Sequence, residues 1–317
     1  MKEIGGYFGL EQFSGKPYHS GLAAVNSGRN ALLYILKARG YRKLYIPRFL
    51  CDTVSQLCKR EGIAYEEYGI TPEFLPAFHG TPGPEEAVYI VNFYGQLPDT
   101  LLLQLQAQWG RIIVDNVQDF FRKPLAGVDT VYSCRKFFGV PDGGYAACEG
   151  AALSLEPDAS RDRMTHILGR FEVSGSAYYS DFQANDEGFY PLPLREMSPL
   201  TQNLLRAVDY DAIRKARSTN YALLEKALGK ENRLHLTAPD GPYCYPFYCQ
   251  NGMAVKRALA QNKIYVPTLW PNVPENPAAT PLEVDYAKNI LPLPCDQRYT
   301  EDDMKRIVEE IQLCMNI

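Results

Sequence analysis

The chain has 317 residues, of which 46% are hydrophobic and 22% charged, with a formal net charge of −4. This composition predicts a soluble globular protein with room for one large domain and a smaller one. The mild acidity, without a cluster of lysines and arginines, gives no electrostatic basis for binding nucleic acid. No apolar run approaches the roughly 18–20 residues of a membrane span, and the N-terminal sequence has no signal-peptide core. The eight cysteines form neither a Cys-x-x-Cys pair nor a Cys/His group, so we expect reduced thiols in a cytoplasmic protein and no metal site.

Residues 20–150 alternate between helical and strand-like patterns. The first helix is expected to begin at Asn26-Ser27-Gly28 and to end at Gly40, with apolar side chains at helical spacing between them. Two more helices are expected at 52–61 and 100–109, and strands at 43–47, 64–68, 87–93, 112–115 and 128–134, followed by a second apolar run at 145–148. Strands interleaved with helices are typical of βαβ units, which predicts a mostly parallel sheet covered on both faces. A ligand site is then expected at the carboxyl ends of the strands.

The pattern changes after residue 150. We expect a helix at 161–171, an irregular Tyr-, Gly- and Pro-rich stretch at 174–193, and a long helical region at 198–228 that breaks near Asp209-Tyr210-Asp211. A smaller α+β unit follows, with strands near 234–236, 243–249 and 263–266 and helices near 253–261 and 300–314. These features predict a large α/β domain over residues 1–195. They place the long connecting helix and a small α+β domain in residues 196–317.

Lys136 ends a strand-like run, lies beside two phenylalanines, and precedes a Pro-Asp-Gly-Gly turn. Apolar surroundings disfavour an ammonium group, so a lysine held there becomes available as a free amine. Such an amine forms Schiff bases with aldehydes, including pyridoxal phosphate. The alternative is a solvated lysine in a hairpin, and this segment alone favours that alternative.

Other features of the first half fit the same cofactor. Asn26-Ser27-Gly28-Arg29 opens a helix, where free N–H groups and the helix dipole can hold a phosphate. Asp115 ends a strand and can pair with a protonated pyridine nitrogen, which keeps the ring an electron sink. Gln118 can hydrogen-bond the ring's phenolic oxygen or pack nearby, and the Ser133 hydroxyl can reach the phosphate. The alternatives are an ordinary helix N-cap and an aspartate that caps a loop. The order along the chain, with the phosphate-binding helix first, then the aspartate and then the lysine, favours a pyridoxal phosphate site.

These segments resemble the DegT/StrS-type sugar aminotransferases, which depend on pyridoxal phosphate. Asn26-Ser27-Gly28-Arg29-Asn30-Ala31-Leu32 resembles the family's Asn-Ser-Gly-Thr-x-Ala-Leu, and Asp115-Asn116-Val117-Gln118 is similar to its Asp-Ala-Ala-Gln. Lys136 precedes Gly143-Gly144 by the same distance as the family's cofactor lysine precedes its Gly-Gly pair.

Two positions depart from the family pattern. The usual Ser-Phe-His-x-x-Lys is shortened here to Ser133-Cys134-Arg135-Lys136. Cys51 stands where many members carry an aromatic side chain that stacks on the cofactor ring, so we expect Cys51 beside the ring.

The resemblance implies an aspartate aminotransferase-like fold (fold type I) with a mostly parallel, seven-stranded-type sheet. It also implies an internal aldimine at Lys136, an amino donor such as glutamate, and a keto-sugar nucleotide as acceptor in polysaccharide or glycan biosynthesis. Family members are homodimers with the active site at the interface. A catalytically silent or regulatory relative, or a pyridoxal phosphate enzyme of another reaction type, stays open because one scaffold hosts many chemistries.

Overall fold

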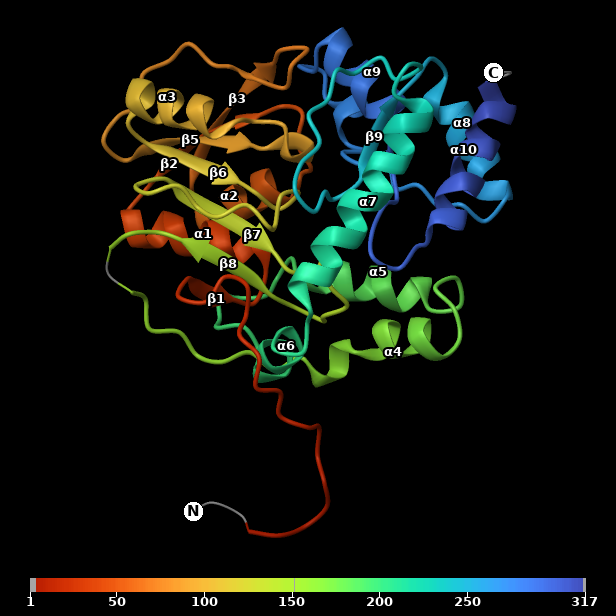
Figure 1. Cartoon of the computed structure of the whole chain (residues 1–317). Helices are drawn as coiled ribbons and strands as arrows, with labels where there is room; N and C mark the ends of the chain where they lie inside the picture. The colour runs from red at the N-terminus through yellow and green to blue at the C-terminus, as the bar shows by residue number, and fades with distance from the viewer. Residues whose placement is uncertain (1–3, 151, 316–317) are drawn as a thin grey trace.

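The computed structural model describes residues 4–150 and 152–315, and it is built around an eight-stranded sheet (Figure 1). The strand order is β1-β8-β7-β6-β5-β2-β3-β4. The strands are β1 (Ala23–Val25), β2 (Lys43–Pro47), β3 (Ala64–Ile70), β4 (Pro76–Ala77), β5 (Glu86–Val91), β6 (Ile112–Asp115), β7 (Asp129–Ser133) and β8 (Gly144–Ala147). The run from β3 to β7 is parallel, whereas β8 is antiparallel to both of its neighbours and β4 is antiparallel to β3. The predicted mostly parallel sheet is therefore confirmed. The apolar run at 145–148 lies mostly in β8, and β1 and β4 are additions to the segments expected from sequence.

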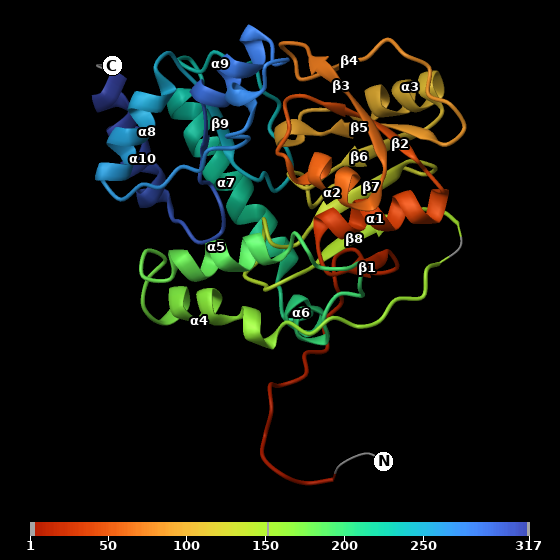
Figure 2. The same ribbon diagram turned by 180° about the vertical axis from the view of Figure 1, so that it is seen from behind.

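Helices cover both faces of this sheet, as the view from behind also shows (Figure 2). Every residue of β6 is buried, as expected for a strand of a parallel sheet that is covered on both sides. Ile113 packs in the same cluster as α1 (Gly28–Arg39) and α2 (Thr53–Glu61), while Ile112 and Val114 pack with α3 (Asp99–Trp109). Alternate side chains of one strand thus contribute to two separate hydrophobic layers.

The helix α1 begins and ends where the sequence predicts. Ser27 is extended, and its side chain accepts a hydrogen bond from the Asn30 N–H, while Gly40 ends the helix at φ 71°. A hydroxyl at the N-cap and a left-handed glycine after the last turn are favoured at these two positions.

The middle of the chain forms a short 3-10 helix (Arg161–Arg163) and then four α-helices in sequence. They are α4 (Thr165–Glu172), α5 (Tyr179–Gly188), α6 (Pro199–Leu205) and α7 (Tyr210–Leu228). The predicted break in the long helical region is confirmed, because the Asp209 side chain caps α7 by accepting from the Ala212 N–H. The irregular stretch predicted at 174–193 is wrong, since α5 lies within it.

A second hydrophobic cluster joins α7 to the C-terminal elements, with Leu224, Phe247, Leu291 and Ile307 among its buried side chains. A two-stranded antiparallel sheet, β9 (Tyr245–Tyr248) with β10 (Ile290–Leu293), is packed among α8 (Gly252–Gln261), α9 (Pro281–Asn289) and α10 (Glu301–Met315). The strands predicted at 234–236 and 263–266 are wrong, because both segments are irregular. Within residues 4–150 and 152–315, none of the helices combines the length and apolar character needed to cross a bilayer.

Candidate active site

The carboxyl ends of two neighbouring strands bring Asp115 and Lys136 to the same edge of the sheet. Asp115 is the last residue of β6 and lies opposite Val131 of β7 in parallel register. Lys136 lies in the turn after β7, which is closed by hydrogen bonds from the Phe137 and Phe138 N–H groups to the Cys134 carbonyl. Burial raises the pKa of the Asp115 carboxyl and the Lys136 ammonium lowers it, so the two groups lie within electrostatic reach of each other.

The Asp115 carboxylate is buried and held by two donors. The Tyr89 hydroxyl of β5 donates to Oδ2 at 2.6 Å, and the Val117 N–H donates to Oδ1 at 2.9 Å. Each oxygen keeps a free lone pair, so the carboxylate can still accept a bond from a ligand N–H. Burial raises the pKa of Tyr89 well above its ordinary value, and the neighbouring carboxylate raises it further. Tyr89 was not predicted as a site residue, although it is the one hydroxyl in the apolar run Glu86–Val91.

The apolar enclosure predicted for Lys136 is wrong for the single chain. Its side chain is exposed, and its Nζ lies 5.7 Å from the centroid of the Tyr243 ring. The neighbouring Phe137 and Phe138 instead turn into a buried cluster with Phe120. The turn buries its aromatic side chains and leaves the amine facing solvent.

A second part of the site is the start of α1, which packs closely on β7 and β8. A Cβ on Gly28 would lie 3.2 Å from the Ser133 Cβ, and one on Gly144 would lie 2.6 Å from the Ser27 carbonyl carbon. The Ser27 hydroxyl is occupied by the Asn30 N–H. The backbone N–H groups of residues 28 and 29 have no hydrogen-bond partner among the residues that the structure describes. Two free N–H groups at a helix N-terminus, beside the Ser133 hydroxyl, form a cradle that fits a phosphate.

The remaining predicted site residues are Gln118, Cys51 and Arg29. Gln118 is buried, and its Oε1 accepts the Tyr94 N–H at 2.8 Å, where Tyr94 has a φ of 56°. The side-chain carbonyl of Gln118 is therefore hydrogen-bonded to the backbone of the loop after β5. Only the amide nitrogen of Gln118 is left for the predicted contact with the ring. Cys51 is a half-buried free thiol after β2, and Arg29 is half-buried.

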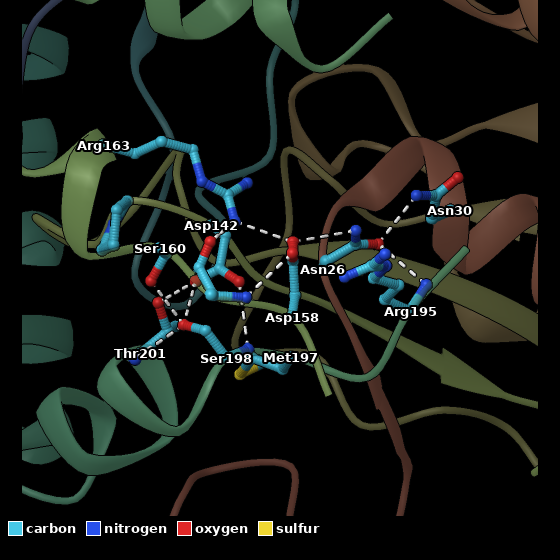
Figure 3. Close-up of polar contacts among 12 residues, drawn as sticks. Asn26, Asn30, Asp142, Asp158, Ser160, Arg163, Arg195, Met197, Ser198 and Thr201 are labelled. Atoms are coloured by element: carbon cyan, nitrogen blue, oxygen red, sulfur yellow. Dashed lines mark hydrogen bonds and ion pairs between the residues drawn. The ribbon is translucent and has the colours of Figure 1, made fainter. Parts of the chain in front are cut away.

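A buried aspartate in the Pro-Asp-Gly-Gly turn, absent from the predicted site, anchors the lysine turn (Figure 3). The Asp142 carboxylate accepts from the Ser198 N–H at 3.0 Å, from the Ser198 hydroxyl at 2.8 Å and from the Thr201 hydroxyl. Burial raises its pKa, and these hydrogen bonds oppose that effect. The turn that follows Lys136 is thus fixed to the N-terminus of α6.

A parallel set of contacts fixes the start of α1 (Figure 3). The Asn26 amide donates to Asp158 Oδ2 at 3.1 Å, and Arg163 pairs with the same oxygen at 2.7 Å. Asn26 Oδ1 in turn accepts from the Asn30 amide at 2.7 Å. Both halves of the cradle are therefore supported by the segment between residues 156 and 201.

The residues present fit pyridoxal phosphate. The site offers a buried carboxylate with free lone pairs, a lysine amine within its electrostatic reach, and a helix N-terminus with unpaired N–H groups. These are the groups that a pyridinium nitrogen, an aldehyde and a phosphate require.

Comparison with known proteins identifies solved structures with a similar fold. No family model matches the sequence, and no curated protein matches it. Similar solved structures include a DegT/DnrJ/EryC1/StrS aminotransferase from Brucella abortus, with a TM-score of 0.62 and 14% identity over 92% of this chain and 85% of that one. NtdA from Bacillus subtilis, with bound cofactor PMP, has a TM-score of 0.66 and 14% identity over 96% and 79% of the two chains. DesI, solved in the presence of its TDP-sugar product, has a TM-score of 0.64 and 13% identity over 92% and 80%. The chain therefore has the fold of these proteins, and the predicted fold type I is confirmed.

Proposed function

We propose that this protein is a pyridoxal phosphate-dependent aminotransferase that passes an amino group from an amino acid, glutamate by expectation, to a keto-sugar nucleotide for polysaccharide or glycan synthesis. The observation that carries the proposal is the placement of Asp115 and Lys136 at the carboxyl ends of adjacent parallel strands. The free N–H groups at the start of α1 support it. So do the PMP bound to NtdA and the TDP-sugar product of DesI, two proteins of the same fold.

Each residue has a stated task in this proposal. The cofactor, when bound, supplies an electron sink for the carbon that loses its proton. Asp115 accepts the hydrogen bond of the ring N–H and keeps that nitrogen protonated. The N–H groups of Gly28 and Arg29, with the Ser133 hydroxyl, bind the phosphate. Lys136 Nζ holds the cofactor and, as a free amine, moves a proton to and from the substrate carbon.

We also propose that the active form is a homodimer. Lys136 is open to solvent in the single chain, whereas a reactive amine is favoured by exclusion of water. Large apolar side chains are exposed on α4 and on the loop that follows it, with Phe171 at 90% and Val173 at 65% exposure. A second copy seated there would cover apolar surface.

We further propose a domain boundary near residue 195 and a cytoplasmic location. The separate hydrophobic cluster around α7 and β9 supports the boundary.

The absorption spectrum of the purified chain with added pyridoxal phosphate tests the enzyme. We expect a borohydride-sensitive visible band that Lys136→Ala abolishes and that glutamate converts to the spectrum of the amino form of the cofactor. Lys59→Ala, at an exposed lysine on α2, should leave the band unchanged. If no band depends on Lys136, the proposed enzyme is wrong.

A catalytically silent relative is the second candidate. It is favoured by the exposure of Lys136 and by a thiol, Cys51, where a stacking ring is expected. A Lys136-dependent band that glutamate and other amino acids leave unchanged would identify a cofactor-binding protein without transaminase activity.

A further inference from the structure

The carbonyl of Phe137, the residue directly after Lys136, accepts two side-chain hydrogen bonds from the C-terminal part of the chain. Arg217 Nη2 of α7 donates to it at 3.3 Å, and Gln297 Nε2, in the loop between β10 and α10, donates at 2.8 Å. A carbonyl oxygen has two lone pairs, so these two donors fill its capacity. Side chains that lie 80 and 160 residues further along the chain thus meet at one atom of the lysine turn.

Arg217 lies where the two parts of the molecule join. In both views, α7 runs between the large sheet and the C-terminal elements (Figures 1 and 2). Tyr210, at the start of α7, packs with the cluster that contains Phe137, whereas Tyr221 of the same helix belongs to the C-terminal cluster. Between these two tyrosines, the Arg217 guanidinium lies 4.5 Å from the centroid of the Phe137 ring.

The burial of Arg217 indicates a fixed geometry rather than a gain in stability. The side chain is charged, yet only 2% of the residue is exposed, and burial lowers its pKa. In the described part of the chain its hydrogen bonds go to the backbone carbonyls of Phe137, Pro242 and Tyr243, and its Nε has no partner. Burial of a charge that is bound only to neutral groups is unfavourable. What the guanidinium provides in return is a fixed spacing between three backbone segments.

The same guanidinium also fixes the surroundings of the Lys136 amine. It donates to the Tyr243 carbonyl at 3.3 Å, and the Tyr243 ring lies 5.7 Å from Lys136 Nζ, within the range of a cation–π contact. The ring centroids of Phe137 and Tyr243 are 6.0 Å apart. Arg217 therefore holds both the turn that carries the lysine and the residue whose ring faces the amine.

We infer that Arg217 and Gln297 are positioning residues for Lys136. They fix the lysine turn to the C-terminal part of the chain and so restrict where the solvent-facing amine can reach. Such restriction favours reaction, because a reacting group that is held in place has already lost the freedom that the reaction would remove. The inference rests on the proposed function, because it names the residues that place the lysine of that function.

A double-mutant cycle on the binding of pyridoxal phosphate tests this inference. With Lys136 present, Gln297→Leu should weaken binding about tenfold and Arg217→Met about tenfold to a hundredfold, as expected for a misplaced reacting group. Arg217→Lys keeps the charge and one donor group, so its affinity should lie between those of Arg217→Met and wild type. In the Lys136→Ala background the cofactor binds without the amine, and the same substitutions should leave its affinity unchanged.

Two features of the design keep a loss of folding from imitating this result. Gln297→Leu is a mild change, because the Gln297 Oε1 has no hydrogen-bond partner among the residues that the structure describes. It carries the test if unfolding curves show that Arg217→Met does not fold. Asn232→Ala is the matched control: it removes a buried amide that donates to the Pro246 carbonyl at 2.9 Å, away from the lysine turn, and should bind the cofactor as wild type does.

Hydrogen exchange of the cofactor-free chain gives a second readout that requires no chemistry. The N–H groups of Phe137 and Phe138 close the lysine turn on the Cys134 carbonyl. If Arg217 and Gln297 hold this turn, its amides should exchange about tenfold faster in Gln297→Leu and Arg217→Met than in wild type, because the turn opens more often.

Two results would overturn the inference. One is an equal loss of affinity with and without the Lys136 amine, which would show that the two side chains only stabilise the fold. The other is unchanged exchange at the lysine turn in both variants. If wild type forms no Lys136-dependent band, the proposed function is wrong, and the exchange measurement then decides by itself whether the two side chains hold the turn.

Discussion

The pairing of Tyr89 with Asp115 shows how a neighbouring strand controls the carboxylate of the site. The phenol donates at 2.6 Å to a carboxylate that burial drives toward its neutral form. The hydrogen bond opposes burial because it stabilises the charged form. A neutral Asp115 could not pair with a protonated ring nitrogen, so the phenol widens the pH range over which the proposed chemistry works.

Tyr89→Phe should raise the pKa of Asp115 and slow amino transfer about tenfold, the kinetic equivalent of one net hydrogen bond of about 1–1.5 kcal/mol. Because the ionised carboxylate is the active form, the acidic limb of the pH–rate profile should move to higher pH. Single-turnover conversion of the bound cofactor by glutamate, measured across pH, gives this profile. Tyr68→Phe removes an equally buried phenol that donates to the Tyr89 carbonyl at 2.7 Å, and its profile should stay unshifted. Equal profiles for the two variants would contradict the role of Tyr89.

His19 carries a separate prediction about stability. Burial lowers its pKa to about 4, whereas an unfolded histidine titrates near pH 6.5. Because the folded-state pKa is the lower one, the unfolded chain binds more protons between these values, and stability falls as the pH drops from 6.5 toward 4. The contribution of His19 to the free energy of unfolding should be about 2 kcal/mol smaller at pH 5 than at pH 7.

Urea unfolding of wild type and His19→Gln at both pH values measures this contribution. Glutamine can still donate to the Phe120 carbonyl, which lies 2.7 Å from the His19 Nε2, but it does not titrate. The decrease in the free energy of unfolding from pH 7 to pH 5 should therefore be about 2 kcal/mol smaller in the variant. The same loss in both proteins would show that His19 is not the group responsible.

At the scale of elements, the close contact between α1 and β8 defines the phosphate cradle. A Cβ on Gly144 would lie within 2.6–2.7 Å of the backbone atoms of Ser27 and Gly28, which cannot move without shifting the helix. Gly144→Ala should therefore destabilise the fold by about 1–3 kcal/mol, as overpacking does, and weaken cofactor binding. Gly188→Ala, at a glycine with no atom within 4 Å of the added Cβ, should preserve both. Thermal unfolding and titration with pyridoxal phosphate measure the two effects, and a cradle that tolerates Gly144→Ala would contradict the close packing.

The elements that sequence patterns predicted well are those with local signals. The N-cap Ser27 and the glycine at position 40 marked both ends of α1, and the apolar run 112–115 matched β6. The helix α5 was missed because it has no buried residue, so no apolar stripe marks it. Residues 263–266 have strand-like composition but no strand partner, and β propensity depends on such context.

One missed element did carry a readable signal. The start of α9 has a capping box formed by Thr280 and Glu283, and proline is its first residue. Both features are typical of a helix N-terminus and could have predicted α9. Like the elements of the fold, the site residues divide into those with a local sequence signal and those without one. The chain order around Asp115 and Lys136 indicated which residues meet, whereas Tyr89 reaches Asp115 from the neighbouring strand β5. Only tertiary packing brings this hydroxyl to the site.

For the whole molecule, the open side of the site and the exposed apolar surface point to the same conclusion. The carboxylate of Asp115 is buried while Lys136 is exposed, so one wall of the site is missing in the single chain. The N-terminal segment extends away from the body (Figures 1 and 2) and exposes 97% of Tyr7 and Phe8. Apolar side chains exposed to this degree mark interaction surfaces when they cluster. In the proposed homodimer, the second copy of the chain buries these side chains and closes the site.

Phe171→Glu tests this arrangement at the scale of the assembly. Wild type should sediment as a dimer at micromolar concentration, and the variant should shift toward monomer because burying its carboxylate in an apolar interface is unfavourable. Leu103→Glu places the same charge on α3, at a side chain that is 47% exposed, and should remain dimeric. If closure by the partner supplies the missing wall, the monomeric variant should also form the Lys136-dependent band more weakly than Leu103→Glu does. A monomeric wild type with a full band would show that one chain completes the site alone, and the exposed side chains of α4 would then need another explanation.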